Sequence, residues 1–213
     1  MAERDRAAIE ELVRRVLLEK LGGNGPRVKK VEVPRLDVAA EHRMDTGNPA
    51  DRVWTRDLFT LEEAPHVKYV RAIDISDEMV VKAKQKMADH GVTNVEVTQT
   101  DLFDPCLEPA SFDVVTAFNV LCYVEDSAAV LARIRSLLKP GGRFLSATDC
   151  LGEKLTKVGV KKWFKSRTGS MPYVAFYKMK GLERRIADAG FTVVESENLF
   201  PAPPNLFVAA RKV

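Results

Sequence analysis

One stretch of the sequence, residues 67–87, constrains the fold more than any other. Residues 67–73 predict a buried strand, which turns directly into a predicted helix over residues 77–90. Asp74 follows the strand, and Ser76 is of the type that caps a helix. Ligands of open α/β sheets bind at the carboxyl ends of strands, where a carboxylate can accept hydrogen bonds from ribose hydroxyls. Asp74 is therefore either a ribose ligand or an ordinary turn residue.

The composition is typical of a globular protein in a reducing compartment. The 213 residues, 46% hydrophobic and 30% charged, suffice for one α/β domain or for a domain with an appendage. A net charge of +3 is too small to indicate a nucleic-acid or membrane partner. The three cysteines lack the spacing of a disulfide framework or a zinc site. No apolar run has spanning length, so we expect a cytoplasmic protein without a metal site.

The first 65 residues contain one strong pattern and several weak ones. Residues 5–21 place apolar side chains at spacings of three and four, which predicts an amphipathic helix. The glycine-rich residues 22–26 predict a linker, because a phosphate loop would follow a buried strand. Residues 28–33 and 53–59 predict short strands, and Pro34 suits the end or the edge of a sheet.

From His66 onward the sequence alternates between predicted strands and helices. Phe112 to Phe118 is a nearly continuous apolar run, which predicts a strand buried on both faces. Residues 139–142 are expected to separate a helix from the next strand. The other elements are predicted strands at 95–98, 143–149, 191–200 and 205–213, and helices at 126–138 and 180–189. This alternation predicts a parallel, doubly wound sheet with a hairpin at its end.

Three polar residues follow three consecutive predicted strands: Asp74, Asp101 and Asn119. The carboxyl ends of parallel strands meet at one edge of a sheet, so we expect these side chains around one crevice. Carboxylates suit the ribose hydroxyls and the exocyclic amine of an adenosine. The apolar neighbours available for the base are Ile75, Met79 and Leu102. Each polar residue taken alone is more often a turn former.

The motifs AIDISDEM, SFDVVTAFNVLCYVED, LLKPGG and AGFTVVES resemble the class I S-adenosylmethionine-dependent methyltransferases of the small-molecule type, over residues 64–213. The resemblance implies a Rossmann-like sheet with helices on both faces, with S-adenosylmethionine as cofactor and a small molecule as methyl acceptor. It implies that Asp74 binds the ribose and that Ile75 and Met79 flank the adenine. It also implies that Asp101 and Leu102 reach the adenine edge and that Asn119 lines the methionine side.

The sequence departs from this family at one point. Members begin with a strand and a Gly-x-Gly-x-Gly loop, and none of the twelve glycines here forms such a loop. The missing strand is central, between the strand that ends at Asp74 and the strand Phe112–Phe118. Without a substitute, both neighbours would expose unpaired backbone groups. Residues 28–33 and 53–59 lack the continuous apolar character of a central parallel strand. We therefore expect a marginal fold and weak cofactor binding.

The run RMDTGNPADRVWTRDLFTLEEAP resembles the entry segment of the ethanolamine-utilisation cupin proteins of bacterial microcompartments, over residues 5–65. None of the cupin strands follows. The two resemblances divide the chain into an N-terminal helix and linker segment, residues 1–65, and a methyltransferase-like domain, residues 66–213. A chain divided in this way is interpreted as a fusion with a truncated methyltransferase. The helix at residues 5–21 either contacts a microcompartment shell or, as is commoner, packs on its own protein.

The sequence leaves the catalytic residues open. Methyl transfer from a sulfonium depends mainly on proximity and alignment, so the family has no universal catalytic residue. Cys122, Tyr123 and Asp149 could act on an acceptor, although packing or capping is the commoner role. Residues 157–177 stand where such enzymes place a cap over the acceptor. Three functions remain: a small-molecule methyltransferase, a non-catalytic interaction module derived from one, and a microcompartment-associated protein.

Overall fold

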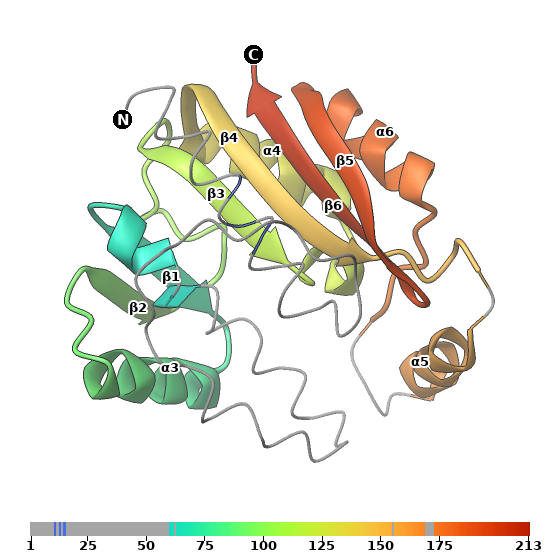
Figure 1. Ribbon diagram of the computed structural model, residues 1–213, viewed down its shortest axis with the longest axis horizontal. Coiled ribbons are helices and arrows are strands. Elements are labelled where there is room, and N and C mark those ends of the chain that lie inside the picture. Colours follow the sequence, from blue (N-terminus) through green and yellow to red (C-terminus); the bar gives the residue numbers. More distant parts are fainter. Residues whose placement is uncertain are drawn as a thin grey trace.

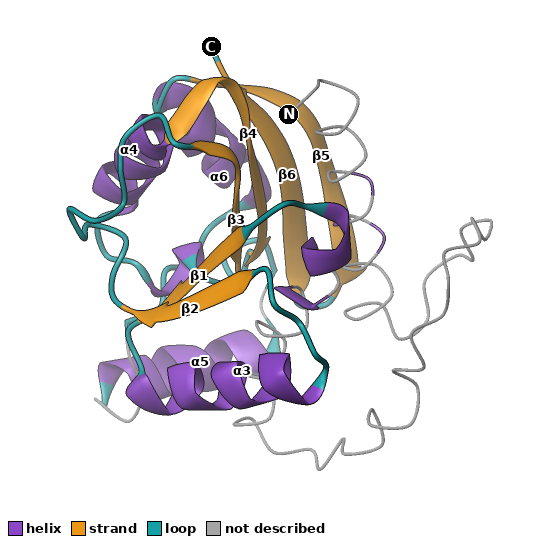
Figure 2. Ribbon diagram, turned by 90° about the vertical axis from the view of Figure 1, so that its left-hand side faces the viewer, coloured by secondary structure: helices purple, strands orange, loops and turns teal. Residues whose placement is uncertain are grey.

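The computed structural model describes residues 60, 61, 63–154, 156–168 and 173–213, together with Glu11, Val13 and Arg15. Two sheets and their covering helices make up this part of the chain (Figures 1 and 2). The predicted linker and the predicted strands at 28–33 and 53–59 lie outside the described residues. No helix within the described ranges is long and apolar enough to cross a membrane.

The first sheet has two parallel strands, β1 (Val70–Asp74) and β2 (Val95–Gln99), joined by helix α3 (Asp77–Asp89). The Ser76 hydroxyl accepts a hydrogen bond from the Met79 N–H at 3.4 Å, which confirms the predicted cap. β1 begins at Val70, later than the predicted residue 67, and it is preceded by a short 3-10 helix, η3 (Ala64–His66). The Asn94 side chain holds that helix in place by donating to the carbonyls of Ala64 and Val67, at 2.7 and 2.9 Å.

The second sheet has four strands in the order β3-β4-β6-β5. β3 (Phe112–Phe118) and β4 (Leu138–Asp149) are parallel, and β5 (Phe191–Pro201) and β6 (Pro204–Lys212) form the predicted antiparallel hairpin. β4 begins at Leu138, directly after α4, so no loop separates the helix from the strand as predicted. Residues 139–142 instead form a register shift within the strand, because Phe112 pairs with Leu138 and Val114 with Arg143. A Cβ on Gly142 would lie 3.2 Å from the Asp113 carbonyl oxygen on β3.

Both faces of the four-stranded sheet are covered. Helices α4 (Ser127–Leu137) and α6 (Met179–Asp188) lie on one face (Figure 2), where they build the largest apolar cluster around Phe144. On the other face Val13 is 1% exposed and packs in a cluster with Phe118, Leu145 and Phe207. Val13 belongs to the apolar stripe of the predicted N-terminal helix, so this stripe residue is packed on its own protein.

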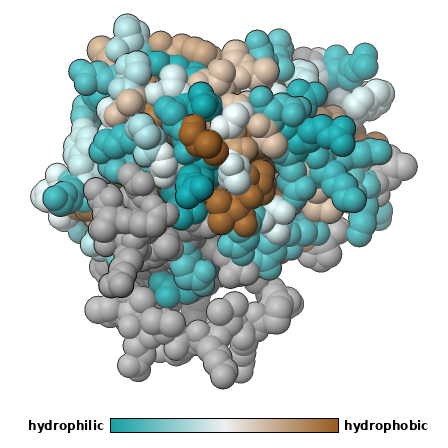
Figure 3. Space-filling view, turned by 90° about the horizontal axis from the view of Figure 1, so that it is seen from above, coloured by the Kyte–Doolittle hydropathy of each residue, from teal (hydrophilic) through white to brown (hydrophobic). Residues whose placement is uncertain are grey.

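Two further helices lie near the carboxyl ends of the strands. η4 (Leu121–Tyr123) follows β3, and α5 (Lys157–Arg167) follows β4 within the predicted cap segment. The α5 side chains Trp163 and Phe164 are 49% and 63% exposed. Seen from above the view of Figure 1, the described surface is mainly hydrophilic, with hydrophobic side chains gathered near its centre (Figure 3).

Gly152, in the turn after β4, lies against the chain that leads into α6. Its N–H donates to the Tyr177 carbonyl at 2.9 Å, and an added Cβ would lie 2.4 Å from the Phe176 carbonyl oxygen. Gly152→Ala is therefore expected to lower the free energy of unfolding by about 1 to 3 kcal/mol, measured in urea. Gly181→Ala is the control, because the nearest atom to its Cβ is 4.0 Å away and alanine favours a helix. Equal stability of the two variants would contradict the prediction.

Candidate cofactor and acceptor site

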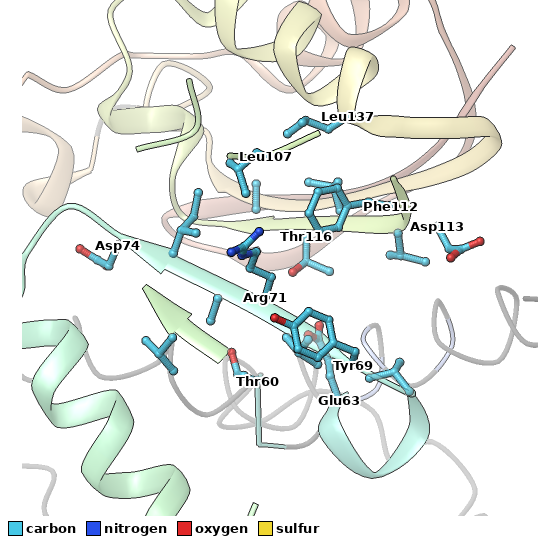
Figure 4. Close-up of a pocket in the computed structure, with 18 of the residues that line it drawn as sticks. Thr60, Glu63, Tyr69, Arg71, Asp74, Leu107, Phe112, Asp113, Thr116 and Leu137 are labelled. Atoms are coloured by element: carbon cyan, nitrogen blue, oxygen red, sulfur yellow. The ribbon is translucent and has the colours of Figure 1, made fainter. Parts of the chain in front are cut away.

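The two sheets do not join. Within the described strands, β1 pairs only with β2, and β3 pairs with β4 but not with β1. A cavity of about 1140 Å³ lies between them, lined by every residue of β1 and of β3 (Figure 4). All of β1 and the first five residues of β3 are consequently half-buried. The expected burial of these two strands is wrong, and the cavity beside them is the physical reason.

Asp74 marks the end of the cavity at the carboxyl end of β1 (Figure 4). Its Oδ1 accepts a hydrogen bond from the Ser76 N–H at 2.9 Å, which fixes the carboxylate at the start of α3. Met79 and Leu102 also line the cavity, and both are half-buried. Three of the predicted cofactor residues thus line the same cavity, a carboxylate and two apolar side chains.

The other three predicted residues lie outside this lining. Ile75 is 76% exposed. Asp101 is exposed, and its Oδ1 accepts a hydrogen bond from the Phe103 N–H at 2.7 Å, which is the geometry of an Asx turn. Asn119 is half-buried at the end of β3 with a positive φ of 52°. Their placement neither requires nor prevents a contact with a ligand at the cavity mouth.

One arginine that the sequence did not single out fixes the loop after β2. Arg133, on α4, donates to the carbonyls of Leu102, Asp104 and Leu107 at 3.1, 2.9 and 2.9 Å. The loop carries Asp101 and Leu102, whereas α4 packs on the four-stranded sheet. This guanidinium therefore ties a cavity wall from one sheet to the core of the other. Its signal in the sequence is weak, because it is one of two arginines on α4.

A polar network lies at the carboxyl ends of β3 and β4. The Asn205 amide donates to Asn119 Oδ1 at 3.1 Å and to Asp149 Oδ1 at 2.9 Å. Lys162, on α5, donates to Asp149 Oδ2 at 2.9 Å and lies 5.8 Å from the ring centre of Tyr123. Burial lowers the pKa of Lys162, but the neighbouring Asp149 charge outweighs it and the pKa is raised. Asp149 is thus held as a paired carboxylate.

Two of the cysteines lie beside this network in the interior. Cys122 is 1% exposed, and its thiol donates to the Asn119 carbonyl at 3.6 Å. Burial raises the pKa of the Cys150 thiol to about 12, so it stays protonated at neutral pH. The geometry of Cys122 corresponds to packing, the commoner of its two predicted roles. Asn205, at the start of β6, was not among the predicted site residues.

A buried carboxyl group closes the other end of the cavity. Glu63 lines it beside Tyr69, on the side away from Asp74 (Figure 4). The residue is half-buried, but its Oε1 is closed to solvent and has no hydrogen-bond partner within the described ranges. Burial raises the pKa of Glu63 to about 8, so the carboxyl group is mainly neutral at pH 7. Among the described residues, no group of three or more His, Cys, Asp or Glu could hold a metal ion.

Comparison with known families gives two matches. Residues 54–144 match a family model described as a methyltransferase domain. Residues 4–80 match the model of the ethanolamine utilisation protein EutQ. The two ranges overlap over residues 54–80, which includes β1 and the start of α3.

Individual relatives repeat this division. The acetate kinase EutQ of Clostridioides difficile is 39% identical over 74 residues, which cover 30% of this chain and 47% of that protein. A ubiquinone biosynthesis O-methyltransferase of Xanthomonas euvesicatoria is 38% identical over 80 residues, 37% of this chain and 33% of that protein. The phosphoethanolamine N-methyltransferase 2 of Caenorhabditis elegans is 30% identical over 139 residues, 62% of this chain and 29% of that protein. The chain spans less than half the length of each of these relatives.

Solved structures agree on the fold. An S-adenosylmethionine-dependent methyltransferase of Mesorhizobium loti superimposes with a TM-score of 0.57 at 19% identity, covering 75% of this chain and 86% of the other. One from Aquifex aeolicus gives 0.57 at 20% identity, covering 75% and 79%. The cofactor that these matches imply is S-adenosylmethionine. The chain therefore has the Rossmann-like fold of the S-adenosylmethionine-dependent methyltransferases, matches a methyltransferase domain over residues 54–144, and matches the EutQ model over residues 4–80.

Proposed function

We propose that this chain binds S-adenosylmethionine at the Asp74 end of the cavity and transfers its methyl group to a small-molecule acceptor. The observation that carries the proposal is that Asp74, Met79 and Leu102 all line this cavity. A carboxylate suits the ribose hydroxyls, and the two apolar side chains suit the faces of an adenine. These residues fit the nucleoside part of the cofactor.

The absence of a Gly-x-Gly-x-Gly sequence bears on the methionine part of the cofactor. Such a loop lets a backbone approach the cofactor carboxylate closely. A chain without it loses those backbone contacts, so we infer binding weaker than in a complete enzyme.

When bound, the cofactor supplies the electrophilic methyl group. The protein then has to align the acceptor and exclude water. Both oxygens of Asp149 are engaged, one by Asn205 and one by Lys162, so this carboxylate is better suited to positioning than to accepting a proton. We infer that this network, beneath α5, shapes the acceptor end of the site.

The names of two relatives and the pairing of one lysine on α5 favour a small acceptor over a nucleic acid. The names of two matched relatives, an O-methyltransferase of ubiquinone biosynthesis and a phosphoethanolamine N-methyltransferase, refer to small molecules. The cationic side chains of α5 also include Lys162, which is already paired with Asp149. All three cysteines are free, which is compatible with the reducing cytoplasm in which we place the protein.

The interrupted sheet favours one second candidate, a non-catalytic interaction module derived from a methyltransferase. Under this alternative the cavity no longer binds cofactor and the domain serves as a contact surface. A shell contact through residues 5–21 is a further proposal, and the burial of Val13 counts against it because that stripe residue is already packed.

Calorimetric titration with S-adenosylmethionine separates the two candidates. We expect weak but saturable binding, and a loss of affinity of about 30- to 100-fold in Asp74→Ala, as for one or two hydrogen bonds to a charged group. Asp77→Ala is the control, because Asp77 is exposed in the first turn of α3 and does not line the cavity. Circular dichroism establishes that each variant is folded. A folded wild type that does not bind would contradict the enzyme and favour the interaction module.

A further inference from the structure

Positive charge is concentrated in one segment of the chain. Residues 154–182 hold eight of the 33 lysines and arginines and none of the 30 acidic residues, so the rest of the chain has a net charge of −5. The overall net charge of +3 conceals this separation. A protein with such an uneven distribution is attracted to an anionic surface through its basic segment, although its overall charge is small.

The centre of this segment is α5, which lies at the edge of the molecule, away from α4 and α6 (Figures 1 and 2). Its inner face includes Gly159, which is buried, and Lys162, whose Nζ lies 2.9 Å from Asp149 Oδ2. Ser166, four residues after Lys162, is half-buried on the same face. The helix is therefore held to the protein along one face, and its opposite face is turned to solvent.

This outer face of α5 is apolar at its centre. Val160 and Phe164, one turn apart, are 54% and 63% exposed, and Trp163 beside them is 49% exposed. Single exposed apolar side chains are normal on a protein surface, whereas a group of them marks an interaction site. Three side chains bury little area, so a partner must supply a second attraction.

Cationic side chains border this apolar group. Lys157, Lys161 and Lys165 recur at spacings of four along the helix, and Arg167 Cζ lies 5.5 Å from the Trp163 ring centre. All four cations are exposed, and none forms an ion pair within the described part of the chain. Because α5 contains no acidic residue, their charge is available to an anionic partner.

Apolar side chains bordered by cations match the surface of an anionic membrane. Its phosphates attract lysine and arginine, and its acyl boundary takes up the apolar side chains of a helix that lies in the membrane plane. A nucleic acid attracts the same cations but has no apolar layer for Val160 and Phe164.

We propose that α5 docks this protein onto a bilayer that contains anionic phospholipids. Val160, Trp163 and Phe164 enter the acyl boundary, and the four exposed cations of α5 lie among the phosphates. The inference does not depend on methyl transfer.

The test is sedimentation of the full chain with vesicles made of equal parts of phosphatidylcholine and phosphatidylglycerol. We expect binding to these vesicles, weaker binding in high salt and little binding to phosphatidylcholine alone, because most of the attraction is electrostatic. Trp163 moves into a less polar environment, so protein fluorescence should shift to shorter wavelengths on binding. The shift should be absent in Trp163→Phe.

Two triple variants separate α5 from the rest of the surface. Replacing Lys157, Lys161 and Lys165 by glutamine should weaken binding about fivefold for each cation, or on the order of 100-fold in total. The matched control removes three exposed cations from α3, α6 and β6, as Lys84→Gln, Arg184→Gln and Arg211→Gln. It should bind within about threefold of the wild type, since distant charges are screened. Circular dichroism establishes that each variant is folded.

Phe164→Ser tests the apolar contact. It should weaken binding about tenfold, because the ring no longer leaves water. An unchanged affinity in this variant would show that α5 does not enter the acyl boundary.

Three further results would overturn the proposal. A wild type that does not bind the anionic vesicles would exclude the membrane. Equal binding by the two triple variants would show a general effect of charge. Binding to a DNA duplex or a single-stranded RNA that is tighter than binding to vesicles, and that is lost in the α5 variant, would assign this surface to nucleic acid. Because no cofactor is present, failure here is distinct from failure of the proposed function.

Discussion

Arg133→Met is expected to lower the free energy of unfolding by about 2 to 4 kcal/mol and to release the loop after β2. The variant keeps much of the apolar stem but removes three charged hydrogen bonds, those to the carbonyls of Leu102, Asp104 and Leu107. A guanidinium is rigid and planar, so it can donate to all three carbonyls at once, whereas the methionine thioether donates no hydrogen bond. Urea unfolding measures the stability, and hydrogen exchange at residues 102–107 reports the release of the loop.

Arg135→Met is the matched control. It lies on the same helix and also donates to backbone carbonyls, of Gly190 and Val213, but these bonds are exposed and lie away from the cavity. We expect a loss below about 1 kcal/mol and unchanged exchange in the loop. Equal losses in the two variants would show that Arg133 does not tie the loop to α4. Arg133→Lys should lose an intermediate amount of stability, because a lysine ammonium cannot reach three carbonyls in the fixed geometry of a guanidinium.

Glu63→Gln is expected to flatten the pH dependence of stability. Burial raises the pKa of Glu63 from its ordinary value of 4.5 to about 8 in the folded protein. Between these values the folded state holds a proton that the unfolded state has released. Stability therefore falls as the pH rises, by up to about 1.4 kcal/mol for each pH unit, and the loss is complete above pH 8. Glutamine cannot ionise, so thermal midpoints at pH 5, 7 and 9 should differ less in the variant.

Glu78→Gln is the control for this series. Glu78 is exposed on α3, and the hydrogen bond from Lys82 lowers its pKa, so it titrates below this pH window. Its variant should keep the slope of the wild type between pH 5 and 9. A Glu63→Gln variant with an unchanged slope would contradict the burial of an uncompensated carboxyl group at the end of the cavity.

Much of the fold was predictable from residues that act locally. The apolar run of β3, the Ser76 cap of α3 and the hairpin of β5 and β6 follow from side-chain type and spacing. The errors in strand bounds and burial arise where a contact with another strand determines the structure. Residues 139–142 were predicted to separate a helix from a strand, but they lie within β4 as a shift of its register against β3. The sequence motifs predict that the central strand is missing. They do not predict that β1 and β3 are half-buried, which follows because no described strand lies between them.

The site was predictable only in part. Asp74, Met79 and Leu102 line one cavity because the segments that follow β1 and β2 meet at the carboxyl ends of these strands, which is a property of the topology. Arg133, Asn205 and Glu63 were missed, since each acts across a distance in the sequence that no local pattern records. Arg133 contacts carbonyls 26 to 31 residues away, and Asn205 contacts Asn119 across 86 residues. The cofactor roles of Ile75, Asp101 and Asn119 stay predictions.

The unequal cores of the two sheets have a consequence for any titration with a ligand. Counted over the described residues, the β1–α3–β2 layer has a cluster of four buried side chains, whereas the largest cluster of the four-stranded sheet has sixteen. The smaller layer can thus open while the larger stays folded. A ligand that contacts Asp74 and Met79 binds only when this layer is closed, so its apparent affinity is multiplied by the closed fraction. If this layer folds when the ligand binds, the heat-capacity change of binding will be more negative than the ligand contact area alone predicts. The excess then measures the local folding equilibrium.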